Sequence, residues 1–317
     1  MGSYTQTMVE AKRLINNEIV AGVAEDIISL NPIFSFMPFI GYDGQAIIVN
    51  REVALGGAAT SSIGVTLTST MKAAATFTRT TFTATKLIAD THMDGLVQAQ
   101  SVSAGVDQVA IEISSKAKNI GRQFQQGMAT GSGTAPAMNS FHSMCMVDTQ
   151  YTTAATTQVL SFALLDELLD LVKTKDGECD FIVMPARTLR SLKVLYRNLG
   201  GTTPTHVIEM PDGTKRTIYM YEDIPVFKNE YLSVVETLNG DALTGGVLTS
   251  VWAGVWDDGS QKIGLAAIHP SSVPAGLVVH PVGVNIDHDE DVWRVKQYAN
   301  MALFNRRGLA RLTSISN

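Results

Sequence analysis

The chain has 317 residues, of which 45% are hydrophobic and 17% charged, and its formal net charge is −6. This composition is typical of a folded globular protein, and the acidic balance argues against a nucleic-acid binder, which usually carries a basic stripe. The two cysteines, Cys145 and Cys179, form neither a disulfide framework nor a zinc signature, which favours a reducing compartment. With no signal-peptide pattern and no apolar run long enough for a bilayer, we expect a soluble protein that is not secreted by the usual route.

Residues 8–30 place apolar side chains at helical spacing and predict a helix. Asn31 should end this helix, because the residue before a proline avoids the α region of the backbone map. The helix could be an ordinary core helix or an N-terminal arm that docks on another surface. The sequence leaves both interpretations open.

Residues 41–90 predict one long two-stranded ribbon. A strand from Gln45 to Val53 leads into a small, polar stretch typical of a loop, and a second strand begins at Thr76. In this second strand threonines alternate with side chains such as Phe77, so that neither face is properly apolar. A lone hairpin is only marginally stable in water, and its open edges pair readily with other chains. We therefore expect the ribbon to lie on a second copy of the protein.

Four charged residues near the ribbon are the candidates for contacts between subunits: Arg51, Glu52, Lys72 and Arg79. The simpler interpretation is that these charges are merely solvated, since an exposed ion pair contributes only ~0–1 kcal/mol. In a large assembly, however, such weak contacts repeat over many subunits.

The clearest amphipathic helix is predicted from Val102 to Met128, where apolar residues recur at steps of three and four. From residue 160 onward, helix and strand patterns alternate as in an α/β sandwich. A final hairpin is predicted to turn at Asp287 to Asp291, and its second strand to continue to Phe304. The segments between are predicted as helices at 162–172 and 186–200, strands at 180–185, 248–257 and 262–268, and a hairpin at 205–227.

No catalytic, cofactor or metal site is predicted. The glycines at 131–133 lack the Lys-Ser/Thr of a phosphate loop, and the acidic stretch from Asn285 lacks the glycine and glutamate of a calcium loop. No GxSxG or HExxH motif occurs, and the six histidines show no ligand spacing. A cysteine nucleophile paired with a distant histidine has no specific support. We therefore expect a protein that is not an enzyme.

Several segments, in this order, resemble one known family. They are NPIFSFMPF and VNREVALG, FTATKLIADTHMDGLVQAQ before the long helix, FQQGMATGSGT at its end, DFIVMPARTLRSL, EDIPVFKNEYLS and WRVKQYANMALFNRRGLARL. The set is similar to the major capsid proteins of tailed bacteriophages, which have the Hong Kong 97-type capsid fold. One departure is Asp223, where that family commonly has glycine.

The resemblance implies an α+β chain with six regions: an N-terminal arm (1–40), an extended β-ribbon loop or E-loop (41–90), a peripheral domain with a long spine helix (91–150), an axial α/β domain (151–270), peripheral return strands (271–300) and a closing axial strand (301–317). Some relatives form Lys–Asn cross-links, for which Lys72 would be the candidate lysine.

The implied function is that of a structural shell subunit. Hexamers and pentamers would form an icosahedral head around packaged double-stranded DNA, with separate scaffolding, portal and decoration proteins as further partners. The protein would be found in the virion, after assembly in the host cytoplasm, and would use no cofactor and no membrane. The alternatives are an encapsulin-like compartment with the same fold, an α/β enzyme with an unrecognised site, and a phage tail or adhesion protein.

Overall fold

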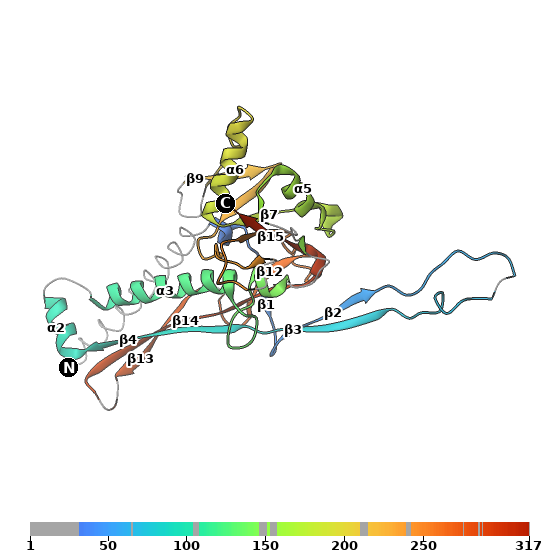
Figure 1. The fold of residues 1–317 in the computed structure, drawn as a ribbon. Helices are drawn as coiled ribbons and strands as arrows, with labels where there is room; N and C mark the ends of the chain where they lie inside the picture. The colour runs from blue at the N-terminus through green and yellow to red at the C-terminus, as the bar shows by residue number, and fades with distance from the viewer. Residues whose placement is uncertain are drawn as a thin grey trace.

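The computed structural model describes most of the chain: residues 32–64, 66–103, 108–145, 151–152, 157–209, 215–238, 242–274, 276–284, 286 and 288–316. The helix expected at 8–30 and the turn expected inside the 205–227 hairpin lie outside these ranges. The described residues form two mixed sheets and a separate two-stranded ribbon, which projects from the body of the molecule (Figure 1). None of the helices in this part of the chain has the length and apolar character that a membrane span needs.

The long strand β14 (Glu290–Leu303) organises the lower, five-stranded sheet. Its first half lies between two antiparallel partners, and Arg294 is held opposite Asp90 by two hydrogen bonds of 2.8 Å. This cross-strand ion pair, together with the alternation of apolar side chains, favours the observed register between β14 and its partner strand. The other strands of this sheet are β1 (Phe39–Tyr42), β12 (Leu265–Pro270), β13 (Val278–Val284) and β4 (Thr85–Asp94).

Helix α3 (Gln108–Thr130) packs along this sheet (Figure 1). The predicted apolar stripe is confirmed where it is described, because the residues at its three- and four-residue steps are buried: Val109, Ile113, Ala117, Ile120, Phe124 and Met128. The first four pack with Trp293 and Val295 of β14, whereas Phe124 and Met128 belong to the cluster that contains Met301 and Leu303 further along the same strand. The structure begins the helical region earlier than expected, with α2 (Gly95–Ser103) immediately after β4. The helix ends before Gly131, where a Cβ atom would lie 2.3 Å from the carbonyl oxygen of Met138.

The upper, eight-stranded sheet is built around β7 (Phe181–Met184), whose four residues are all buried. Its order is β5 (Tyr151–Thr152), β15 (Leu309–Ser316), β11 (Thr249–Gly254), β7, β10 (Ile224–Lys228), β9 (Lys215–Tyr221) and β8 (Thr205–Glu209), with β6 (Gln158–Val159) also on β15. Helices α5 (Phe162–Asp170) and α6 (Ala186–Asn198) pack on its outer part (Figure 1). The shorter helices are η1 (Pro32–Ser35), α4 (Phe141–Met144), η2 (Lys175–Gly177) and η4 (Arg306–Gly308).

Two features of this region differ from what the sequence suggested. The strand predicted at 262–268 is β12, which belongs to the lower sheet, so the last strands of the chain cross between sheets. The β9–β10 hairpin is closed by Glu222 and Asp223, which both have positive φ, 46° and 65°. This is the geometry of a tight two-residue hairpin turn, and a glycine at position 223 would adopt it with less strain.

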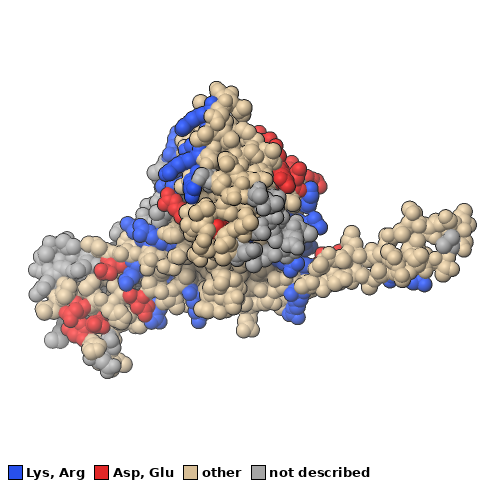
Figure 2. Space-filling model, in the orientation of Figure 1, with Lys and Arg blue, Asp and Glu red and all other residues tan. Residues whose placement is uncertain are grey.

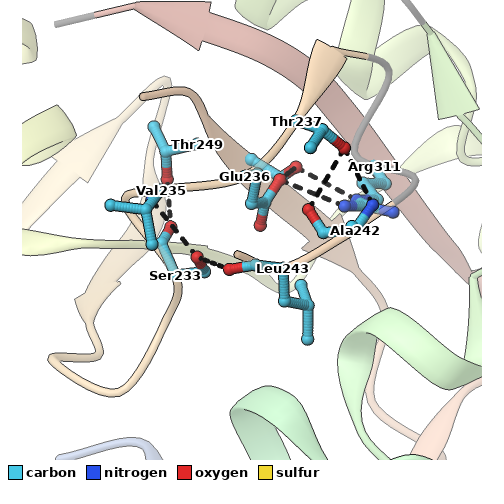
Figure 3. A network of polar contacts seen from close by, with 9 residues as sticks. Ser233, Val235, Glu236, Thr237, Ala242, Leu243, Thr249 and Arg311 are labelled. Atoms are coloured by element: carbon cyan, nitrogen blue, oxygen red, sulfur yellow. Dashed lines mark hydrogen bonds and ion pairs between the residues drawn. The ribbon is translucent and has the colours of Figure 1, made fainter. Parts of the chain in front are cut away.

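A buried polar network lies in the upper sheet (Figure 3). Arg311 on β15 donates to Glu236 at 3.1 Å and to the hydroxyl of Ser250 at 3.1 Å, and Ser250 donates in turn to Glu236. The carboxylate of Glu236 is fully buried and Arg311 is almost so. This network fixes the segment that enters β11 to the closing strand of the chain.

Candidate assembly surface

The ribbon consists of β2 (Ile47–Ala54) and β3 (Thr76–Phe82), which pair only with each other among the described strands. The pairing runs from Ile47 opposite Phe82, next to the body, to Ala54 opposite Thr76 at the far end. The paired part is shorter than the expected 41–90, because β1 and β4 belong to the lower sheet. Strand alternation gives the ribbon two faces of different character.

One face is attached to the body, and we call it the inner face. Ile47 and Phe82 are buried there together with Tyr42 and Phe304. The rings of Phe82 and Phe304 meet edge to face with centroids 6.2 Å apart. The hydroxyl of Tyr42 accepts a hydrogen bond of 3.0 Å from the backbone of Ala84. Among the described residues, these contacts anchor the base of the ribbon to its own chain.

Arg51 extends this anchor. Its Nε donates to the carbonyl oxygen of Phe304 at 2.9 Å, and a second guanidinium nitrogen donates to the carbonyl of Leu303. Burial, with a smaller effect from nearby Arg306, lowers the pKa of Arg51 to about 10, so the side chain remains charged at neutral pH. Among the four predicted interface residues, Arg51 is thus occupied with its own subunit, and a contact to another copy stays a prediction.

The opposite, outer face of the ribbon is exposed throughout. It carries Ile48, Asn50 and Glu52 from β2 and, directly across from them, Thr81, Arg79 and Phe77 from β3. Phe77 is 66% exposed and Ile48 is 49% exposed. The predicted residues Glu52 and Arg79 lie on this face as diagonal neighbours. The outer face therefore combines apolar surface with charges of both signs, as a binding surface does.

Most of the described residues in the tip of the ribbon, between 55 and 75, are also exposed. The tip is closed by a hydrogen bond of 2.8 Å between the amide of Gly57 and the carbonyl of Ala73. A Cβ atom on Gly57 would lie 1.6 Å from the carbonyl oxygen of Thr70, so only glycine allows the two arms to approach this closely. Lys72 is exposed at this tip, away from Glu52 and Arg79. Three large apolar side chains, Leu55, Ile63 and Leu67, are more than half exposed.

A cavity of about 560 Å³ lies where the ribbon meets the body. Its lining includes four cationic side chains, Arg51, Lys262, Arg306 and Arg307, and one carboxylate, Glu52. The base of the ribbon is thus a positively charged recess, in contrast to the net negative charge of the chain.

The thiols do not have the character of nucleophiles. Burial raises the pKa of Cys145 to about 12, and it raises the pKa of Cys179 to about 12 as well. A reactive cysteine needs a lowered pKa to be a thiolate at neutral pH. Within the described ranges, no three histidine, cysteine or carboxylate side chains come together in a way that could hold a metal ion.

The sequence singled out Glu52, Lys72 and Arg79, which the structure places on the exposed part of the ribbon, but not the exposed apolar side chains beside them. Phe77 and Ile48 were available as a signal, because they share one face by strand alternation. Which face points away from the body, however, depends on the packing of Phe82 on Phe304.

No protein-family model and no curated protein sequence matches the chain. Solved structures match it closely in fold at low sequence identity. The SrpI encapsulin of Synechococcus elongatus PCC 7942 is 13% identical, with 90% of this chain and 87% of that chain covered and a TM-score of 0.66. The capsid of cyanophage A-1(L) is 12% identical, with 90% and 93% covered and a TM-score of 0.65. The capsid of a native GTA particle is 10% identical, with 90% of each chain covered and a TM-score of 0.61.

Proposed function

We propose that this chain, which has the Hong Kong 97-type capsid fold, is a major capsid protein that assembles into hexamers and pentamers of an icosahedral shell around packaged double-stranded DNA. The single observation that carries the proposal is the ribbon. It exposes a mixed apolar and charged face that the described part of its own chain does not cover, on a fold shared with shell-forming proteins over 90% of the chain. Such a projection is explained if it lies on a neighbouring subunit.

The regions of the chain take their roles from this proposal. Residues 41–90 act as the extended loop, α3 as the spine helix of a peripheral domain at 91–150, and residues 271–300 as its return strands. The upper sheet at 151–270, closed by residues 301–317, acts as the axial domain. Residues 1–40 act as an arm that docks on a neighbour. The assembled protein is located in the virion, and assembly takes place in the host cytoplasm.

A second candidate is an encapsulin-like compartment, which the similarity to the SrpI encapsulin supports. The two functions use the same fold and differ in what the shell encloses. Several of the similar structures are phage or GTA capsids, which favours the capsid function.

Electron microscopy of the purified protein, with light scattering for mass, tests the proposal. Closed polyhedral shells or rings of five and six subunits are the expected result, and nuclease-protected DNA inside particles from infected cells identifies a capsid. Enzyme cargo in place of DNA would identify the compartment. A monodisperse monomer or dimer at high concentration, unchanged by candidate scaffolding protein or crude phage lysate, would contradict both shell functions.

A further inference from the structure

The two helices on the outer part of the upper sheet carry opposite charges. Helix α6 has four basic residues and no acidic one: Arg187, Arg190, Lys193 and Arg197. Helix α5 has three acidic residues and no basic one: Asp166, Glu167 and Asp170. A helix whose charged side chains all have the same sign is unusual, because positive and negative side chains are normally mixed on a protein surface.

The basic residues of α6 form one stripe. At 3.6 residues per turn, the positions 187, 190, 193 and 197 fall within about a third of the helix circumference. The three arginines are exposed, and the ammonium group of Lys193 lies 3.9 Å from the centre of the Tyr219 ring, which fixes that edge of the stripe on β9. Val194 lies within the same arc and is 46% exposed. We call this surface the basic flank.

The acidic residues lie on the other side of α6. Tyr196 lies on the opposite side of α6 from Arg187, about 180° around the helix axis. Its ring contacts Phe162 of α5, with the ring centroids 5.1 Å apart. Phe162 stacks in turn on Tyr221, whose hydroxyl donates to Asp166. The aromatic cluster therefore separates the two charged surfaces. Figure 2 shows the result: basic residues gather on one flank of the upper part of the molecule and acidic residues on the opposite flank.

The acidic flank is hollowed. A cavity of about 480 Å³ there is lined by five carboxylates, Asp170, Glu178, Asp180, Glu222 and Asp223. One cation within the subunit approaches them, since Lys175 forms an ion pair of 2.9 Å with Asp180. The recess remains strongly acidic, and its size suits the ends of long basic side chains.

We infer that the basic flank of α6 in one copy docks on the acidic flank of a second copy, in a head-to-tail contact around the axis of each hexamer and pentamer. A two-fold axis brings the same patch of two subunits together, so it cannot place the basic flank of one copy on the acidic flank of the other. A head-to-tail contact, repeated by the same rotation from copy to copy, uses both flanks of every subunit and closes a ring. Charge complementarity also sets the register of the contact and disfavours wrong pairings. This inference rests on the proposed function, because it assigns a contact within the proposed rings.

Charge reversal tests the contact. The variant Arg190→Glu/Arg197→Glu leaves the stripe with two basic and two acidic side chains, and Asp170→Lys/Glu178→Lys leaves the recess with three carboxylates and two new lysines. Each variant is expected to raise the protein concentration needed for half-maximal ring or shell formation at least about tenfold, because the net attraction between the flanks is lost and like charges meet at the altered positions. The four-fold variant exchanges the charges at these positions, so opposite charges meet there again and assembly should recover. Sedimentation and electron microscopy measure the assembled fraction.

Lys118→Glu/Arg122→Glu is the matched control, since it changes the net charge equally at exposed residues on α3. It should assemble as the wild type does. Thermal unfolding of every variant confirms that the fold is kept, since all the altered side chains are exposed.

Three results would overturn the inference: normal assembly of both flank variants, no recovery in the four-fold variant, or an equal loss in the control. Loss of binding to a short DNA duplex by the basic-flank variant alone, with normal assembly, would assign the stripe to nucleic acid instead. If the particles enclose enzyme cargo in place of DNA, the proposed capsid function fails, while the same variants still test the flank contact. A wild type that never associates contradicts both.

Discussion

At the scale of single residues, the buried pair of Glu236 and Arg311 is the most consequential feature of the upper sheet (Figure 3). Burial raises the pKa of the Glu236 carboxyl above its usual value, although Arg311 and Ser250 act against this. Removing two charges from water is costly, and the pair offsets that cost only while both partners are present. The pair therefore serves mainly to hold the segment before β11 in place against β15, and it adds little net stability.

Replacing Arg311 by leucine is expected to lower the free energy of unfolding by about 3–5 kcal/mol, because the carboxyl of Glu236 is left buried without its partner. The double variant Glu236→Leu/Arg311→Leu should recover most of this loss. Denaturant unfolding of the unassembled chain measures both. A double variant as unstable as the single one would show that the arginine acts by packing alone.

The loss should also depend on pH, with a defined sign. Without Arg311, the folded-state pKa of Glu236 rises further above its unfolded value, so the folded state binds more protons than the unfolded one between these two pKa values. The stability of Arg311→Leu should therefore fall as the pH rises from about 4.5 towards neutrality. A pH-independent difference from the wild type would contradict this explanation.

At the scale of elements, the two faces of the ribbon differ in what they contact. The inner face is attached to the body through Phe82 and Arg51, and the outer face, with Phe77 and Arg79, is exposed and is the surface that we propose for contact with a neighbour. Strand alternation makes this division possible, because adjacent residues point to opposite sides. Stability and assembly can therefore be changed independently within one strand of seven residues.

Two variants in β3 test this division. Phe82→Ala should lower the free energy of unfolding by about 3–5 kcal/mol, as expected for a buried aromatic side chain. Phe77→Ala should leave unfolding within ~0.5 kcal/mol of the wild type and reduce shell formation. Arg79→Glu, on the same outer face, should likewise weaken assembly and leave the fold intact. Normal shells of normal stability from both outer-face variants would remove the ribbon from the interface.

At the scale of the whole molecule, the exposed tip at residues 55–75 adds little to the subunit's own core. Its large apolar side chains, Leu55, Ile63 and Leu67, are exposed rather than buried. Surface of this kind, carried on a projection from the body, is typical of a segment that is buried only after association.

Replacing residues 56–74 by a short Asn-Gly turn should therefore leave the melting temperature of the unassembled chain nearly unchanged, while closed shells no longer form. Calorimetry and electron microscopy measure the two effects on the same preparation. A shortened chain that still forms normal shells would show that the tip is dispensable, and a large drop in melting temperature would show that it stabilises its own subunit.

The sequence by itself determined the features that depend on local periodicity. The apolar stripe of α3, the threonine-rich strand β3 and the long strand β14 were all predictable, because helices repeat every 3.6 residues and strands every two. The absence of a recognisable catalytic motif and the order of elements were also read from the sequence, and they led to the capsid-like fold that the comparisons support.

Only the tertiary structure decided the features that depend on contacts between distant segments. The sequence could not predict that the guanidinium of Arg51 donates to the carbonyls of Leu303 and Phe304, about 250 residues away. The placement of β12 in the lower sheet and the separation of the charged flanks by Phe162 and Tyr196 likewise involve partners far apart in the chain. Periodicity tells which side chains share a face, but the packing of the whole chain decides what each face meets.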